Sequence, residues 1–210
     1  MNQNGQTPSL ALRLECMGLV VGGHTLPRFQ VRAGEAVCLH VEYSPGSLPW
    51  YDCLLPLLVG RIQHPAIRLY GPAASLDRPF PRRRWLPWRR HPSTRDWLLY
   101  EGRLSPQEAE HVLSLVPVSP AMRVTSLGWN DRTMLALEAC LLHPPELLVF
   151  DTAGSAVPTI QAVFDRLATR PTDLALAYLK TNLDAGSPCL PGASCYEIAT
   201  DSPQTTAAVE

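Results

Sequence analysis

Residues 127–151 have the sequence LGWNDRTMLALEACLLHPPELLVFD, which predicts a helix and a strand in direct succession. Apolar side chains recur with helical spacing over 131–143. The two prolines that follow end this helix, because proline cannot donate the backbone hydrogen bond that would continue it. The apolar run 147–150 then predicts a buried strand of a parallel sheet, with Asp151 at its carboxyl end.

The segments on both sides of this stretch alternate between strand and helix patterns. Short apolar runs bounded by glycine or proline predict strands, and longer segments with helical periodicity predict helices. The helix at 105–115 has the clearest start, with a serine cap, a proline at the first helical position and acidic residues in the first turn. We therefore expect an α/β layered domain with a largely parallel sheet. The predicted strands are 10–21, 29–31, 36–41, 66–70, 147–150 and 174–179, and the predicted helices are 51–60, 105–115, 131–143 and 158–170.

Composition limits the class of protein to which the chain can belong. It has 210 residues, 46% of them hydrophobic, which suits one domain with a sizeable core. The net charge of −1 argues against a disordered chain and against a generally nucleic-acid-binding one. No run is apolar for long enough to predict a membrane span, and the polar residues 1–9 lack the pattern of a signal peptide. We expect flexible ends over 1–9 and 201–210.

Lysine occurs once in the chain, at Lys180, and all other basic side chains except histidine are arginine. Lys180 follows no glycine-rich run, so the chain has no P-loop lysine for the β- and γ-phosphates of a nucleotide. No pattern predicts a metal site, because the six histidines are dispersed and Cys189 and Cys195 lack the spacing and partners of a zinc site. The remaining four cysteines lie singly in apolar runs and are expected to be small buried side chains in a cytosolic protein.

Three segments, in their order and spacing, resemble the ATP-binding subunit of ABC transporters. Val31 to Glu35 and the apolar strand after them resemble the turn and strand before that family's phosphate loop, and 53–60 resembles the helix behind the loop. Residues 127–142 are similar to the signature motif and its helix, and 143–151 to the run into the Walker B strand. The resemblance covers about residues 10–185.

The resemblance implies a nucleotide site that is degenerate in each of its motifs. Val21 replaces the aromatic residue that stacks on adenine, and Tyr51 stands at the position of the phosphate-binding lysine. Thr152 follows the Walker B-like Asp151 where the family has the glutamate that polarises water, and Asn182 is nearest to the switch histidine. These losses imply no hydrolysis and weak or absent ATP binding, since phosphoryl transfer depends on positioning and charge neutralisation. The degenerate positions are Val21, Trp50, Tyr51, Asp52, Asp151 and Thr152.

The resemblance also implies a fold and a role. The fold is a P-loop NTPase-like domain of the ABC ATPase type over 10–200, with a reduced helical insert at about 72–130. The role is that of a catalytically inactive accessory subunit of an ABC-type transport assembly, docked to a permease, to an intact ATPase subunit or to both. Such a subunit is cytoplasmic and peripheral at the inner membrane. A residual nucleotide sensor without turnover is a further alternative.

Residues 78–97 concentrate arginine and tryptophan in an otherwise slightly acidic chain. Guanidinium and indole groups suit protein interfaces, anionic lipid headgroups and single-stranded nucleic acid. The matching region of the resembling family faces the permease, which favours partner docking or membrane contact over nucleic-acid binding. A proline-stiffened, solvated loop with its indoles in the core stays open as the alternative without a binding role. The functional alternative is a soluble scaffold or regulator that binds a protein or nucleic acid through this segment. The expected contact residues are Arg82, Arg83, Arg84, Trp85, Trp88, Arg89 and Arg90.

Overall fold

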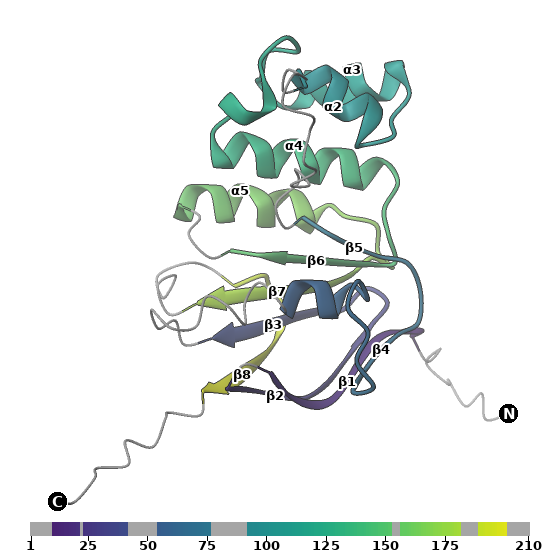
Figure 1. Ribbon diagram of the computed structural model, residues 1–210, viewed down its shortest axis with the longest axis vertical. Helices are drawn as coiled ribbons and strands as arrows, with labels where there is room; N and C mark the ends of the chain where they lie inside the picture. Colours follow the sequence, from purple (N-terminus) through teal and green to yellow (C-terminus); the bar gives the residue numbers. More distant parts are fainter. Residues whose placement is uncertain are drawn as a thin grey trace, which may run out of the picture.

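A mixed sheet of eight strands forms the centre of the described part of the chain, and helices are stacked beside it (Figure 1). The computed structural model describes residues 10–21, 23–41, 54–76, 92–152, 156–181 and 189–200. The strands are β1 (Leu12–Val21), β2 (His24–Arg32), β3 (Ala36–Val41), β4 (Ile67–Leu69), β5 (Ala73–Ser75), β6 (Leu147–Asp151), β7 (Ala175–Thr181) and β8 (Ser194–Thr200). The helices are α2 (Thr94–Tyr100), α3 (Pro106–Leu115), α4 (Trp129–Leu142) and α5 (Val157–Ala168), with a 3-10 turn at Val124–Ser126 and helical residues at 54–58.

Two halves of the sheet with different strand directions meet at β8. The order is β4-β1-β2-β8-β3-β7-β6-β5, and all pairs from β8 to β5 are parallel. Strands β4, β1 and β2 pair antiparallel. Strand β8 joins the halves, and its register with β2 consists of His24 opposite Thr200 and Thr25 opposite Ala199. The seam between the halves is therefore short and lies at the carboxyl end of β8.

Each face of the sheet buries its own apolar cluster. Phe150 and Tyr178 face α4 and α5, whereas their strand neighbours Val149 and Ala177 face the β1–β2 hairpin and the helical residues 54–58. This alternation follows from the opposite directions of successive side chains in a strand. Because both faces of β6 and β7 are covered, these strands are apolar except at their carboxyl ends, and this apolar run is the pattern that predicts them.

The helices form successive layers on the Phe150 face. Figure 1 shows α5 nearest to the sheet, α4 beyond it, and α2 and α3 farthest away. Glu138 of α4 is buried at 5% exposure and accepts two hydrogen bonds from the Arg166 guanidinium of α5, at 2.6 and 3.0 Å. A paired guanidinium and carboxylate of this geometry is a strong, directional contact, so it holds the two helices together.

The start of α3 confirms the predicted cap. The Ser105 hydroxyl accepts the Glu108 amide at 3.3 Å, and the Glu108 carboxylate accepts the Ser105 amide at 2.7 Å. This reciprocal capping box satisfies two amides that the helix cannot pair itself, and Pro106 takes the first helical position. The same hydrogen bonds to Ser105 lower the pKa of the Glu108 carboxyl below its usual value.

The structure confirms the predicted strands and helices and the mostly parallel sheet, but the strand predicted over 29–31 is longer and spans His24–Arg32. The helix predicted over 51–60 is described over 54–58 and is followed by Gly60 with a positive φ of 71°. The helix predicted over 158–170 ends earlier, at Ala168, and Arg170 instead caps it by donating to the Leu167 carbonyl at 3.0 Å.

Three elements had no counterpart in the prediction. Strand β5 has only three residues, β8 is largely exposed, and α2 follows the arginine–tryptophan segment. The predicted insert at 72–130 contains α2 and α3 but also β5, which pairs with β6 in the sheet. The ends at 1–9 and 201–210 lie outside the described residues, and the domain boundaries stay predictions.

Candidate functional site

The carboxyl ends of β3, β6 and β7 meet at one edge of the sheet, because these strands run parallel. After β3 the chain continues to the helical residues 54–58 on the Val149 face, and after β6 it continues to α5 on the Phe150 face. Ligands of open α/β sheets bind where such connections leave toward opposite faces. This carboxyl edge is therefore the candidate functional site. Residues 42–53, 153–155 and 182–188, which follow the three strands, lie outside the described residues, and Trp50, Tyr51 and Asp52 are among them.

Val21 lies at the same edge of the sheet. It pairs with His24 at the tip of the β1–β2 hairpin, and His24 pairs with Thr200 at the carboxyl end of β8. Because β8 runs parallel to β3, this places Val21 at the carboxyl edge with Asp151. The side chain is half-buried against the apolar cluster under the hairpin. A valine at this place contributes no aromatic face on which a nucleotide base can stack.

Asp151 and Thr152 end β6 in different environments. Asp151 is half-buried and lies opposite Leu179 of β7. Thr152 is 4% exposed, and both its amide and its hydroxyl donate to the Leu179 carbonyl at 3.0 Å. The hydroxyl proton of Thr152 is therefore bound to the backbone of the neighbouring strand. The residue stabilises the end of the sheet and has no carboxylate with which to accept a proton from water.

Charged side chains form a row across β7, β3 and β8, near the carboxyl ends of these parallel strands. Lys180 on β7 lies opposite His40 on β3, which in turn lies opposite Glu197 on β8. Lys180 is 9% exposed and its Nζ donates to the Cys189 sulfur at 3.5 Å. His40 Nδ1 lies 3.4 Å from the Glu197 carboxylate. The one lysine of the chain thus contacts a thiol.

Three cysteines, Cys38, Cys189 and Cys195, gather beside this charged row. Their sulfur atoms all lie within 4.8 Å of one another, and among the described residues they form the one group with the geometry to hold a metal ion. Cys38 is buried, whereas Cys189 and Cys195 are exposed. No sequence pattern indicates this group, because Cys38 is far from the other two along the chain and the spacing of Cys189 and Cys195 matches no zinc-ligand pattern.

The segment that resembles the signature motif forms the beginning of α4. Gly128 precedes the helix without a capping side chain, and Trp129 takes the first helical position with 43% of its surface exposed. The Arg132 guanidinium fixes this entry by donating to the carbonyls of Leu127 at 2.8 Å and Thr125 at 3.1 Å. An indole held on the surface at a rigid helix start is a group that protein interfaces favour.

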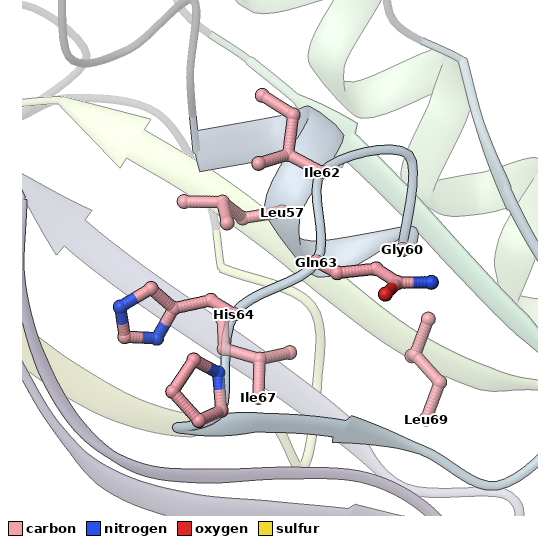
Figure 2. Close-up of a pocket in the computed structure, with 8 residues that line it drawn as sticks. Leu57, Gly60, Ile62, Gln63, His64, Ile67 and Leu69 are labelled. Atoms are coloured by element: carbon pink, nitrogen blue, oxygen red, sulfur yellow. The ribbon is translucent and has the colours of Figure 1, made fainter.

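A recess of about 490 Å³ opens between the helical residues 54–58 and β4. Figure 2 shows Leu57 and Ile62 on one side of it and Ile67 and Leu69 of β4 on the other. Its lining is mostly apolar, and His64, at one end, already accepts a backbone amide on Nδ1 at 3.2 Å. Strand β4 lies at the end of the sheet away from β6. The recess therefore lacks the paired acid and base groups of a catalytic site and is separate from the carboxyl edge.

The structure brings together part of the predicted site. Val21, Asp151 and Thr152 share the carboxyl edge, while the predicted phosphate-loop residues fall outside the described residues. The seven predicted contact residues of the arginine–tryptophan segment also lie in the part of the chain that is not described, between Leu76 and Pro92. None of the helices in the described residues combines the length and apolar character needed to cross a membrane.

Comparisons with known proteins give a likeness in fold. No family model matches the chain, and no curated protein sequence matches it. A solved chain from a metal-chelate type ABC transporter, in an inward-facing conformation, is similar over 81% of this chain and 73% of its own length. The TM-score is 0.56 and the sequence identity is 19%. The fold of this chain therefore resembles that of an ABC transporter component, as the order of its segments predicts.

Proposed function

We propose that the chain is an accessory subunit of an ABC-type membrane transport assembly that has lost ATP hydrolysis and acts by docking. Its partner is a permease, an intact ATPase subunit or both, at the cytoplasmic face of the membrane. The likeness in fold supports the assembly, and the preserved order of α4, β6, α5 and β7 supports the type of subunit. The observation that carries the loss of hydrolysis is the environment of Thr152.

Hydrolysis requires a group that orients and deprotonates water beside the metal-binding aspartate. At this place the chain has Thr152, whose hydroxyl is bound to the Leu179 carbonyl and is buried. A hydroxyl is too weakly basic to accept the proton, and the Thr152 hydroxyl is already oriented toward the Leu179 carbonyl. Asp151 alone could hold a metal ion but could not activate the attacking water.

The charge needed to bind a triphosphate is also missing. The chain has one lysine, and its ammonium group lies on the α5 side of β7 in contact with Cys189. The segment after β3, where a phosphate-binding lysine belongs, contains only Arg61 as a basic residue before β4 apart from histidine. We therefore expect Mg-ATP to bind weakly or not at all.

One surface next to the arginine–tryptophan segment suits a docking role. Ser93, near the end of that segment, forms a β-bridge with Arg123, and the Thr94 amide donates to the Met122 carbonyl at 2.8 Å. These contacts hold the carboxyl end of the segment beside Met122, whose side chain is 41% exposed. The described carboxyl end of the segment, from Pro92, therefore lies next to an exposed apolar side chain.

Co-purification from native membranes tests the docking role. We expect the tagged chain to recover a permease or an intact ATPase subunit, and this recovery to fall when Arg82, Arg83, Arg84, Arg89 and Arg90 are all changed to glutamine. The control changes two exposed arginines outside the segment, Arg61→Gln with Arg103→Gln, and should recover the partner normally. Recovery of neither partner by the wild-type chain would refute the docking role.

Calorimetry tests the loss of nucleotide binding separately. We expect no saturable heat with Mg-ATP at millimolar concentration and no phosphate release by the purified chain. Saturable binding without turnover would favour a nucleotide sensor instead.

The arginine–tryptophan segment favours a second function, a scaffold or regulator that binds protein or nucleic acid. A gel shift with single-stranded nucleic acid that weakens steeply as salt rises would support that alternative over membrane docking.

A further inference from the structure

The register of three parallel strands builds a row of reactive side chains on the α5 face of the sheet. Tyr178 on β7 lies opposite Cys38 on β3, and Cys38 lies opposite Cys195 on β8. Residues that are paired in this way project from the same face, so the phenol and the two thiols are neighbours. Phe150 of β6 continues the row and stacks on Tyr178 with ring centroids 5.4 Å apart. Helix α5 covers Phe150 and Tyr178 at one end of the row, whereas Cys195 at the other end is exposed to solvent.

Cys189 is brought to the row by the residue that follows it. Leu190 is 2% exposed in the core, and its amide donates to the Tyr178 hydroxyl at 3.1 Å. A turn with Gly192 at a positive φ of 78° then returns the chain to β8, closed by a hydrogen bond from the Ala193 amide to the Leu190 carbonyl at 3.1 Å. Cys189 is therefore held in place by its neighbour Leu190, although its own side chain is exposed.

We infer that Cys38, Cys189 and Cys195 bind one soft divalent metal ion as three thiolate ligands. Metal–sulfur bonds of about 2.3 Å in a trigonal arrangement place the sulfurs about 4 Å apart. The three sulfurs here already lie within 4.8 Å of one another, so small side-chain rotations would close the site. Thiolates select soft ions such as Zn(II) and Cd(II) over magnesium and calcium, which prefer oxygen.

The charge of Lys180 favours a divalent ion. Three thiolates and a divalent ion leave one negative charge, which is costly beside an apolar core. The Lys180 ammonium, 3.5 Å from the Cys189 sulfur and only 9% exposed, cancels it. The nearby Glu197 carboxylate lies 3.4 Å from His40 Nδ1 and pairs with that side chain. Lys180 thus balances the charge of the metal site without binding the ion itself.

The exposure of the thiols gives the ion a way in. Cys189 and Cys195 are reachable from solvent, while Cys38 lies beneath them at 1% exposure. The site then binds through two accessible sulfurs first and closes on the third.

Cadmium titration of the reduced, full-length protein tests the inference, because cadmium–thiolate bonds absorb in the ultraviolet. We expect wild type to bind one equivalent and Cys189→Ser and Cys195→Ser each to bind at least about tenfold more weakly. The matched control is Cys140→Ser, which removes a half-buried thiol of α4 outside the group and should bind as wild type does. Circular dichroism checks the fold of each variant, and the two exposed positions keep the test valid if Cys38→Ser does not fold.

The charge argument has its own pair of variants. Lys180→Met should weaken cadmium binding by about tenfold, whereas Lys180→Arg, which keeps the charge, should recover most of the affinity. Metal binding in wild type that Cys189→Ser and Cys195→Ser leave unchanged would overturn the inference. So would a reduced wild-type protein that binds no cadmium.

Discussion

The end of β6 and the thiol row across β7, β3 and β8 differ in how their side chains are used. At the end of β6 the sequence resembles a catalytic motif, yet Thr152 is bound to the backbone of β7. In the thiol row no motif is present, yet three sulfurs and an ammonium group converge within a few ångströms. The comparison teaches that the family-like framework of this chain and its reactive groups lie at different places on the same sheet.

Thr152→Glu introduces the residue that ABC transporter ATPases have at the position matched by the resemblance. ATP hydrolysis by this variant would break the comparison. We expect instead a loss of about 4 kcal/mol in the free energy of unfolding, because the new carboxylate would be buried without a partner. Urea denaturation measures the loss, and phosphate release should stay at background. Thr152→Ser keeps the hydroxyl that donates to Leu179 and should stay within about 1 kcal/mol of wild type. ATP turnover by the glutamate variant would show that the framework is still competent.

Glu138→Ala removes the contact between α4 and α5, the layers that cover both regions. We expect the free energy of unfolding to fall by about 2 to 3 kcal/mol, because Arg166 loses its paired acceptor in a partly buried place. Glu110→Ala is the matched control, since Glu110 pairs with Arg95 at 3.0 Å on the surface and should cost less than about 1 kcal/mol. Equal losses in the two urea titrations would contradict a structural role for the buried pair.

Tyr178→Phe tests whether the Tyr178 hydroxyl supports the thiol row. The phenylalanine keeps the stacking on Phe150 but leaves the buried Leu190 amide without its acceptor, so we expect a loss of about 1 to 2 kcal/mol. Cadmium affinity should fall as well, because Cys189 loses its fixed neighbour. Tyr70→Phe, whose exposed hydroxyl donates to Glu15 at 3.0 Å, should change neither quantity appreciably. Unchanged cadmium binding in Tyr178→Phe would show that Leu190 does not position the thiol.

Glu197→Gln has the smallest expected effect. The carboxylate is 87% exposed and lies 3.4 Å from His40, so its removal should change the free energy of unfolding by less than about 0.5 kcal/mol. Cadmium affinity should also stay within twofold of wild type. A larger fall in affinity would extend the metal site to the charged row beside it.

The sequence predicts the parts of the fold that depend on local pattern. The cap of α3 and the apolar run of β6 need only neighbouring residues, and both are confirmed. Strand β8 was missed because its exposed positions hide any alternation, and its place in the sheet depends on β2 and β3. The same register decides which residue faces Cys38, so no spacing along the chain could reveal the thiol group.

The candidate site was predicted only in part for a related reason. The resemblance implied a single nucleotide site that includes Val21 and Asp151, and both residues lie at the carboxyl edge of the sheet. It could not predict that the Thr152 hydroxyl would donate to Leu179, since that contact depends on the final approach of β6 and β7.

The place of β8 in the sheet has a consequence for how the protein is made. Strand β8 separates β2 from β3 but follows every other described strand in the chain, so it leaves the ribosome after them. Until then the nascent protein carries two incomplete sheets with open edges, which are prone to pair wrongly. Cys195 arrives on this same strand. Completion of the sheet and completion of the thiol group are therefore one event, and a chain that ends before residue 194 achieves neither.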